Sequence, residues 1–334
     1  LQSNMAKKTD AEHSYLNTSN GEKVILIVMD GWGLYKPYPG NAIELAKKPF
    51  YDKLWKDYPS AVLKADGESV GLPEGQMGTS EVNHFTIGAG RVEFQDLVRI
   101  NKAIDDGSFY NMDAFIDACS VVKKNKSTLH VIGLASTGGV HSHSEHILAL
   151  VEMAKRQGIQ NVALHLITDG RDTAPQSGLA FLSQIEQSIK EIGIGKIVTL
   201  IGRYFAMDRD HNWDRTDKAF HLMTKSKGEQ FSSVQNAIEH GYAKGITDEF
   251  IEPAVIDGTG DDHGQIKEND AVIFANFRSD RPRQLTERFL EKGPKQLHFV
   301  TMAQYNPSYE VVVAFAPPPI PVSIGEVISE ARIK

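Results

Sequence analysis

The chain has 334 residues, more than a single hydrophobic core usually holds, so its length favours two domains. Hydrophobic residues make up 41% of it and charged residues 24%, and nothing in this composition points to disorder or a fibrous repeat. The formal net charge of -7 argues against a general nucleic-acid-binding surface. An anionic ligand would therefore need a local basic pocket.

The single cysteine, Cys119, leaves no partner for a disulfide within the chain and fits a reducing compartment. Its context, AFIDACSVV, is typical of a small buried residue rather than of a reactive thiol. No apolar run approaches the ~20 residues that span a bilayer, and the start shows no signal-peptide pattern. We therefore expect a cytoplasmic protein with no membrane partner.

The first residues are not expected to contribute to the fold. The opening LQSNM is typical of the remnant of a cleaved tag, followed by the native Met5. The polar residues after it are expected to be flexible. We assign residues 1–22 to this tag remnant and flexible N-terminus.

The segment EKVILIVMDGWG, residues 22–33, is an apolar run that ends at Asp30 and Gly31. It predicts a strand buried on both faces of a parallel sheet, with Asp30 at the end where α/β proteins bind ligands. Asp30 is a natural oxygen ligand for Mg²⁺ or Mn²⁺. Residues 41–58 then predict a helical segment interrupted by Pro49, and AVLKAD, residues 61–66, a short strand.

From Gln95 onward, helical and strand patterns alternate along the chain. Helices are expected near residues 113–124, 144–157, 178–192 and 215–224, and strands at 128–134, 161–168, 196–202, 270–277 and 297–302. Alternating units of this kind predict an α/β fold with a parallel or mixed sheet and helices on both faces. The polar loops at the strand ends, STGGVHSHSEH, DGRDTAP, GRYFAMDRDHNWDR and NFRSDRPR, concentrate histidine, aspartate and arginine residues, and this distribution indicates a ligand-binding site. The tail, residues 311–334, predicts an extended proline-rich linker and a short helix.

The sequence EGQMGTSEVNHFTIGAGR, residues 74–91, concentrates turn-forming residues around Ser80. A serine needs a base or a metal to become a nucleophile. Ser80 has no Gly-x-Ser-x-Gly context, which weakens a hydrolase interpretation. The pattern instead predicts a loop entering a helix, whose free N–H groups would favour a phosphate. The alternative, which spacing alone favours, is that Ser80 caps this helix and Asp30 is a turn residue.

Six segments in the same order resemble the cofactor-independent (2,3-bisphosphoglycerate-independent) phosphoglycerate mutases of the alkaline phosphatase superfamily. They cover most of the chain from about Lys23 onward, which makes the resemblance specific. The segments are VMDGWG, GLPEGQMGTSEVNHFTIGAGR, GGVHSHSEH, DGRD, GRYFAMDRDHNWDR and NFRSDRPRQLT.

The resemblance implies an isomerase of glycolysis and gluconeogenesis that interconverts 3-phosphoglycerate and 2-phosphoglycerate through a phosphoserine. It implies an enzyme that uses two Mn²⁺ or Mg²⁺ ions and requires no bisphosphoglycerate, and we expect a monomer. It also implies an alkaline-phosphatase-like α/β domain, begun by residues 23–94, with a complete α/β phosphotransferase domain inserted at residues 95–318. Residues 319–334 would be the linker that returns to the first domain.

The resemblance also implies the site. Ser80 matches the nucleophile and metal ligand, and Asp30 the companion ligand of the same metal. Asp172 is placed to accept a proton from a glycerate hydroxyl, and His141 to orient the substrate. Arginine forks suit carboxylate and phosphate, and Arg278 and Arg281 are expected to converge on one anion. The substrate-binding set is His141, Arg171, Asp172, Arg203, Arg209, Arg278 and Arg281.

Several residues near these motifs are assigned no ligand role. HSHSEH could form a metal cluster, but we assign His143 and His146 to packing or capping. Asp214 and Arg215 are interpreted as members of weak surface ion pairs.

The chain departs from the family pattern in two ways. Thr79 replaces the usual asparagine before the nucleophile, and Asn83 replaces a glycine, although asparagine tolerates positive φ and should preserve the turn. Family members are also longer, and their C-terminal part carries the remaining metal ligands and an active-site lysine. The chain alone is therefore not expected to complete the reaction. The alternatives are a metal-dependent phosphomonoesterase or phosphopentose mutase of the same superfamily, and a non-catalytic phosphoglycerate-binding module.

Overall fold

The structure is a computed structural model that describes residues 25–256, 264–319 and 322–331. The chain divides into two compact units. Unit 1 comprises residues 1–94 and 320–334, and unit 2 comprises residues 95–319. The segment interpreted as a tag remnant, residues 1–22, lies outside the described residues.

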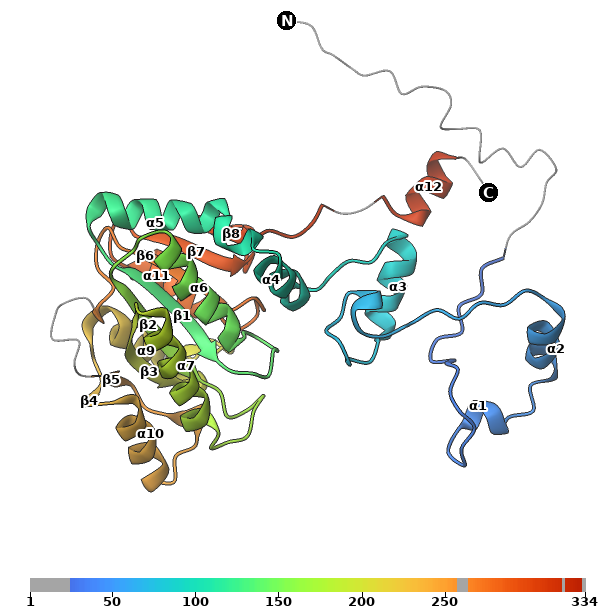
Figure 1. Ribbon diagram of the computed structural model, residues 1–334, viewed down its shortest axis with the longest axis horizontal. Helices are drawn as coiled ribbons and strands as arrows, with labels where there is room; N and C mark the ends of the chain where they lie inside the picture. Colours follow the sequence, from blue (N-terminus) through green and yellow to red (C-terminus); the bar gives the residue numbers. More distant parts are fainter. Residues whose placement is uncertain (1–24, 257–263, 320–321, 332–334) are drawn as a thin grey trace, which may run out of the picture. The chain divides into compact units, whose positions relative to one another are not determined.

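The described residues of unit 2 form an eight-stranded sheet in the order β4-β5-β3-β2-β1-β6-β7-β8 (Figure 1). Neighbouring strands are parallel except β3 and β5, so the predicted mixed sheet is confirmed. The strands are β1 Leu129–Ala135, β2 Val162–Thr168, β3 Lys196–Gly202, β4 Glu229–Phe231, β5 Ala254–Ile256, β6 Ala271–Phe274, β7 His298–Ala303 and β8 Val312–Phe315.

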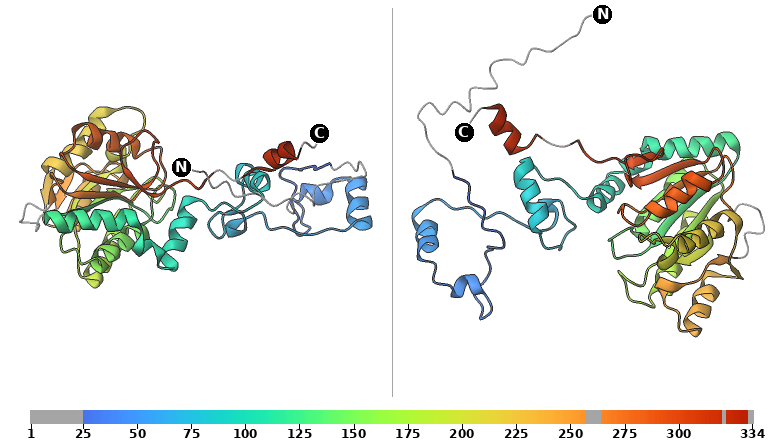
Figure 2. Two further views of the ribbon diagram at one scale, coloured as in Figure 1. Left: turned by 90° about the horizontal axis from the view of Figure 1, so that it is seen from above. Right: turned by 180° about the vertical axis from the view of Figure 1, so that it is seen from behind.

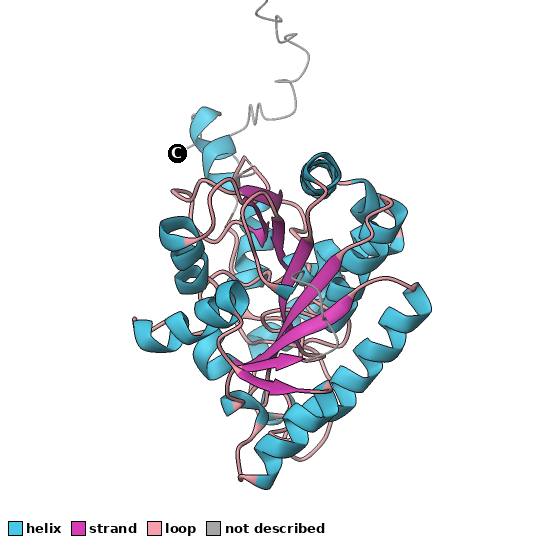
Figure 3. Ribbon diagram, turned by 90° about the vertical axis from the view of Figure 1, so that its left-hand side faces the viewer, coloured by secondary structure: helices cyan, strands magenta, loops and turns pink. Residues whose placement is uncertain are grey.

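Helices cover both faces of this sheet, as Figure 3 shows. The short helices η3 Ser108–Asn111 and η4 Asp248–Phe250 lie in connecting segments. Among the described residues, no helix combines the length and apolar character needed to cross a membrane. The α-helices are α4 Asp96–Asp105, α5 Asp113–Asn125, α6 Ser144–Arg156, α7 Gly178–Ile192, α8 Arg203–Ala206, α9 Trp213–Lys225, α10 Val234–Ala243 and α11 Arg283–Lys292.

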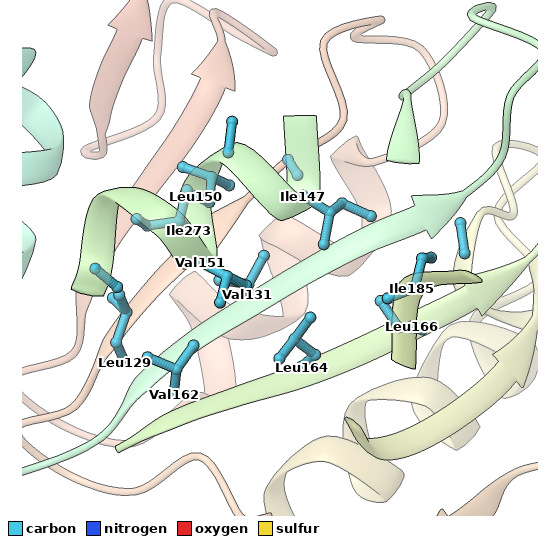
Figure 4. Close-up of a cluster of buried hydrophobic side chains, with 14 of the residues drawn as sticks. Leu129, Val131, Ile147, Leu150, Val151, Val162, Leu164, Leu166, Ile185 and Ile273 are labelled. Atoms are coloured by element: carbon cyan, nitrogen blue, oxygen red, sulfur yellow. The ribbon is translucent and has the colours of Figure 1, made fainter. Parts of the chain in front are cut away.

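The alternation of side chains along β1 divides the core into two layers. Leu129 and Val131 pack with residues of α5, α6 and α7 on one face (Figure 4). Ile132 and Leu134 pack with residues of α8, α9 and α11 on the other face, and Figure 2 shows unit 2 from two further sides. Both faces of a parallel sheet are therefore buried, as its continuous apolar strands predict. Cys119 is buried in the first layer, as predicted, and burial raises its pKa to about 11.

A chain of buried polar side chains crosses the sheet from the residue before β6 to β3. His130 Nε2 lies 3.1 Å from Asp270 Oδ2, and His130 Nδ1 lies 3.0 Å from His165 Nε2. His165 Nδ1 lies 2.8 Å from Thr199 Oγ1. Because buried polar groups destabilise a fold unless they are hydrogen-bonded, these contacts stabilise the alignment of β6, β1, β2 and β3.

Two predictions for the tail and the start of unit 2 need correction. Residues 312–315 form β8, which pairs with β7, where an extended linker was expected to begin. The strand ends before the proline cluster, because proline cannot donate to a ladder. Helices α4, α10 and α11 also lie in segments for which no helix was predicted.

Unit 1 contains short helices. The helical segment interrupted by Pro49 is confirmed, because Asn41 caps one helix and Pro49 begins the next. Residues 25–29 and 61–66, predicted to be strands, are not in strands, and Ile25 is 81% exposed. A strand needs a neighbour to accept its hydrogen bonds, and the described part of unit 1 offers no second strand. The helices are α1 Ala42–Leu45, α2 Pro49–Asp57, η2 Gly67–Val70, α3 Ser80–Ala89 and α12 Ile324–Glu330.

Candidate functional site

The charged loops of unit 2 follow the carboxyl ends of its central strands. The chain runs from β1 through β2 to β3 on one side, whereas β6 and β7 lie on the other side of β1. Ligands of open α/β sheets bind where the strand order reverses in this way. The loops after β1, β2, β3 and β6 supply all the substrate-binding residues expected from the sequence.

Arg203 lies at the centre of this edge, directly after β3. Its Nη1 donates to Asp169 Oδ1 at 2.6 Å and to Asp172 Oδ2 at 2.6 Å. Burial alone would raise the pKa of Asp169, but hydrogen bonds from Ser136 and from the Asp172 N–H, together with Arg203, outweigh it and lower that pKa. Arg203 and Asp169 are both 2% exposed, so this pair is part of the frame of the site.

A cavity of about 250 Å³ opens beside Arg203 and carries an excess of positive side chains. Burial lowers the pKa of Arg281, and the neighbouring charges of Arg203, Arg209 and Arg171 lower it further. Five arginines and three acids line the cavity, and this excess of positive charge suits an anion. The lining residues are Arg171, Arg203, Tyr204, Asp208, Arg209, Asp210, Arg215, Glu249, Phe250 and Arg281.

Asp208 organises the loop that carries Arg209. Its Oδ1 accepts from the N–H groups of Asp210 at 3.1 Å and Asn212 at 2.9 Å. Its Oδ2 accepts from Arg215 Nη1 at 3.2 Å. Asp208 is only 5% exposed, so this loop is held by a buried carboxylate rather than by weak surface ion pairs.

His141 lies beside the cavity and links the loop after β1 to the loop after β6. Its carbonyl oxygen accepts from the Phe277 N–H at 2.9 Å. Its Nε2 lies 3.9 Å from Asp172 Oδ2, and its Nδ1 lies 3.6 Å from Asp280 Oδ1. Burial, and next the charge of Arg203, lower the pKa of His141 to about 4. The imidazole is therefore neutral at pH 7 and can both donate and accept a hydrogen bond.

Arg278 and Arg281 have different partners in this structure. Arg281 lines the cavity and donates to the Met207 carbonyl oxygen at 3.0 Å. Arg278 does not line it, and its Nε lies 3.2 Å from Asp280 Oδ1. Helix α11 begins only at Arg283, so the two arginines lie before the helix and share no helical face.

The two other histidines of the HSHSEH motif have structural contacts, as expected. His143 caps α6 by accepting from the Glu145 N–H at 3.3 Å. His146 is buried with its Nε2 2.8 Å from Asn101 Oδ1. Burial, and next the nearby His143, lower the pKa of His146 to about 3.

In unit 1, Ser80 and Asp30 meet although they are 50 residues apart. The Ser80 hydroxyl donates to Asp30 Oδ2 at 2.7 Å, and His84 Nδ1 lies 3.2 Å from the same hydroxyl oxygen. Thr79 caps helix α3 by accepting from the Val82 N–H, so the alternative that Ser80 is the cap is wrong. Ser80 instead occupies the first helical position, where N–H groups are free.

Asn83 and Gly78, two residues near Ser80, both contact or approach the segment that precedes helix η2. Asn83 lies inside α3 and has no positive φ, so the expectation of a turn there is wrong. Its amide donates to the Ala65 carbonyl oxygen at 3.2 Å. Gly78 allows the backbone before Ser80 to approach the Ala65 carbonyl oxygen, because a Cβ at this position would lie 1.8 Å from that oxygen.

The described residues do not complete a metal site. Asp30 and Ser80 offer two oxygen ligands, whereas Mg²⁺ or Mn²⁺ takes about six. In the part of the chain that the structure describes, no group of three or more His, Cys, Asp or Glu side chains could hold a metal ion. These two side chains therefore cannot by themselves complete the coordination of such an ion.

Sequence reasoning missed several residues of the site. Asp169 lies inside the DGRD motif but had no role assigned, and Arg215 was assigned to the surface although it lines the cavity. Glu249 lies 3.5 Å from Arg171 Nη1, and Asp280 Oδ2 accepts from Arg209 Nη1 at 2.8 Å. The pairing of Glu249 with Arg171 and of Asp280 with Arg209 was not visible in the sequence, because the members of each pair are distant along the chain.

Comparisons with known proteins identify the family to which the chain is similar. A family model described as "BPG-independent PGAM N-terminus" matches residues 100–307. Proteins named 2,3-bisphosphoglycerate-independent phosphoglycerate mutase from Symbiobacterium thermophilum and Listeria monocytogenes are each 46% identical to the chain, over 93% and 92% of its length. The chain spans 62% of each of these relatives. A crystal structure of Leishmania mexicana phosphoglycerate mutase at low cobalt concentration has a TM-score of 0.70 and 28% identity, covering 86% of this chain and 56% of that one.

Proposed function

Because this chain belongs to the 2,3-bisphosphoglycerate-independent phosphoglycerate mutase family, we propose that it is the substrate-holding part of an enzyme that interconverts 3-phosphoglycerate and 2-phosphoglycerate. The observation that carries the proposal is the arginine-lined cavity formed by residues that follow strands β2, β3 and β6 of the unit 2 sheet. Phosphoglycerate carries a phosphate and a carboxylate, and arginine forks bind both groups bidentately. The family match favours this substrate over other phosphate esters.

The residues of unit 2 take the following roles in the proposal. Arg171, Arg203, Arg209 and Arg281 bind the anionic groups, and the neutral His141 orients a glycerate hydroxyl. Arg278 is adjacent to His141 and completes the basic set. Asp172 lies between Arg203 and His141, where it accepts the proton of the attacking hydroxyl.

In unit 1, Ser80 is the proposed nucleophile. In the whole enzyme, its oxygen loses the hydroxyl proton and forms a bond to phosphorus as the bond to the 3-oxygen of glycerate breaks, and the 3-oxygen takes up one proton, so the first transfer is balanced. The 2-hydroxyl then attacks the phosphoserine and gives its proton to Asp172 as the bond between phosphorus and the Ser80 oxygen breaks. The Ser80 oxygen takes up one proton and Asp172 gives one up, which restores both side chains. Retention of glycerate between these two transfers removes any need for a diffusible bisphosphoglycerate.

Mn²⁺ or Mg²⁺, two ions in the whole protein, would supply charge neutralisation at the phosphate. Asp30 and Ser80 are the ligands that this chain offers, and they do not suffice. The Leishmania mexicana phosphoglycerate mutase was crystallised at low cobalt concentration, which is consistent with a divalent metal in the family. We therefore propose that this chain binds phosphoglycerate without converting it.

Calorimetric titration of the chain with 3-phosphoglycerate, without metal, is expected to show saturable binding. Arg281→Gln should weaken it at least about tenfold, because a hydrogen bond to a charged group contributes about 1.5–3 kcal/mol. After addition of Mn²⁺ and enolase, the same samples should form no 2-phosphoglycerate or its product.

The matched control is Arg156→Gln, since Arg156 stacks on Tyr110 and does not line the cavity. It should bind 3-phosphoglycerate like the unmodified chain. Equal loss in both variants would contradict the cavity as the binding site, and turnover by the chain alone would contradict its inactivity.

A further inference from the structure

Asp280 lies among three of the side chains proposed to bind the substrate. Its Oδ2 accepts from Arg209 Nη1 at 2.8 Å, and its Oδ1 lies 3.2 Å from Arg278 Nε and 3.6 Å from His141 Nδ1. A carboxylate that contacts two guanidinium groups in this way presents the same acceptors as a bound phosphate or carboxylate. Asp280 therefore occupies arginines that an anionic ligand would need.

The contacts of Asp280 differ from those that hold Arg203. The Arg203 side chain is 2% exposed, and its partner Asp169 is equally buried, so that pair belongs to the frame. The side chains of Arg209 and Arg278 are 46% and 51% exposed, and that of Asp280 is 30% exposed. Exposed ion pairs are weak, so these contacts can exchange for a ligand without disturbing the core.

Asp280 also leaves hydrogen-bonding capacity unused beside the cavity. Among the described residues, no hydrogen bond reaches Asp280 Oδ1 or His141 Nδ1, although both atoms are buried. Buried polar atoms nearly always have a partner in a settled arrangement. A ligand oxygen would satisfy the imidazole, and a turn of the Asp280 side chain toward solvent would satisfy the carboxylate.

The charge of Asp280 suits the role of a ligand substitute. Burial would raise its pKa, but the hydrogen bond from Arg209 and the charge of Arg278 outweigh burial and lower that pKa. Asp280 is therefore ionised at neutral pH. Its negative charge offsets the mutual repulsion of the arginines when no ligand is bound.

We propose that Asp280 is an internal competitor, which pairs with Arg209 and Arg278 in the free protein and gives them up to an anionic group of phosphoglycerate. The inference rests on the proposed function of the cavity. It predicts that Asp280 weakens substrate binding, whereas a residue that only positions the arginines would strengthen it. The direction of the change in affinity therefore decides between the two roles.

The test is titration of Asp280→Asn with 3-phosphoglycerate, because asparagine keeps the shape and removes the charge. We expect binding about threefold to tenfold tighter than in the unmodified chain, as expected for release of two exposed ion pairs. Asp105→Asn is the matched control, since it removes the same charge from an exposed position at the end of α4 that does not line the cavity. Equal or weaker binding by Asp280→Asn would overturn the inference.

A second variant and a second measurement make the test independent of folding. In a chain that already carries Arg209→Gln, Asp280→Asn should increase the affinity for 3-phosphoglycerate by a smaller factor, because only one of the two arginines that Asp280 contacts is still present. In the unmodified chain, the ¹³C resonance of the Asp280 carboxyl group should move on saturation with 3-phosphoglycerate, and an unchanged resonance would overturn the inference. Failure of the unmodified chain to bind at all would instead overturn the proposed function.

Discussion

Replacement of Arg203 by glutamine is expected to lower the free energy of unfolding by about 3–5 kcal/mol, the usual cost of removing one partner from a buried ion pair. The variant would leave Asp169 buried at 2% exposure without its counter-ion, and would leave Asp172 without its 2.6 Å contact. Urea unfolding followed by circular dichroism measures the loss. Binding of 3-phosphoglycerate should disappear in the same variant.

The control for Arg203→Gln is again Arg156→Gln, whose guanidinium lies on the surface against Tyr110. Its free energy of unfolding should change by less than about 1 kcal/mol. A similarly small loss for Arg203→Gln would contradict the view that Asp169, Arg203 and Asp172 form the frame of the site.

The same variant should also change the response to acid. The folded pKa of Asp169 lies below its usual value, so Asp169 contributes stability that is present above the unfolded pKa and is lost as pH falls through the folded pKa. Without Arg203, the pKa of Asp169 rises. Acid unfolding should therefore begin at a higher pH in Arg203→Gln than in the unmodified chain.

The unmodified chain is expected to lose several kcal/mol of stability between pH 7 and pH 5. Burial lowers the pKa of His141 to about 4 and that of His146 to about 3, and burial followed by His130 lowers the pKa of His165 well below its usual value. The unfolded chain takes up these protons near pH 6.5, before the folded chain does, so stability falls as pH drops below 6.5. Each buried histidine contributes about 1.4 kcal/mol per pH unit in this range.

His146→Gln tests this account at one residue. Glutamine retains a donor for Asn101, which lies 2.8 Å from the imidazole, and it cannot titrate. We expect urea unfolding at several pH values to show that the free energy of unfolding of His146→Gln changes less with pH than that of the unmodified chain. The difference in slope should be about 1.4 kcal/mol per pH unit between pH 6 and pH 4. His240→Gln, at a side chain that is 39% exposed, is the control. Parallel curves for His146→Gln and the unmodified chain would contradict a neutral buried His146.

The sequence predicted the secondary structure of unit 2 more reliably than that of unit 1. Helix α7 and strand β3 agree with the predicted bounds, since their hydrophobic periods are visible locally. Residues 25–29 have the same apolar character as a buried strand but are not one. A strand depends on a neighbour elsewhere in the fold, which a local pattern cannot reveal.

The site could be predicted only in part, for a similar reason. Arginines after strand ends were visible because parallel strands bring their carboxyl ends to one edge. The acids that pair with them were not visible, since Asp280 lies 71 residues from Arg209 and meets it only through the topology of the sheet. Similarly, the sequence could not show that Thr79 rather than Ser80 caps α3, because both residue types favour that position.

The most direct test of the central claim is a crystal structure of this chain with 3-phosphoglycerate. The account predicts the ligand in the cavity of unit 2, with its phosphate or carboxylate within hydrogen-bonding distance of Arg203 and Arg281, and with a hydroxyl facing Asp172. Saturable binding in solution together with a ligand located elsewhere, or a cavity that stays free of ligand at saturating concentration, would contradict it.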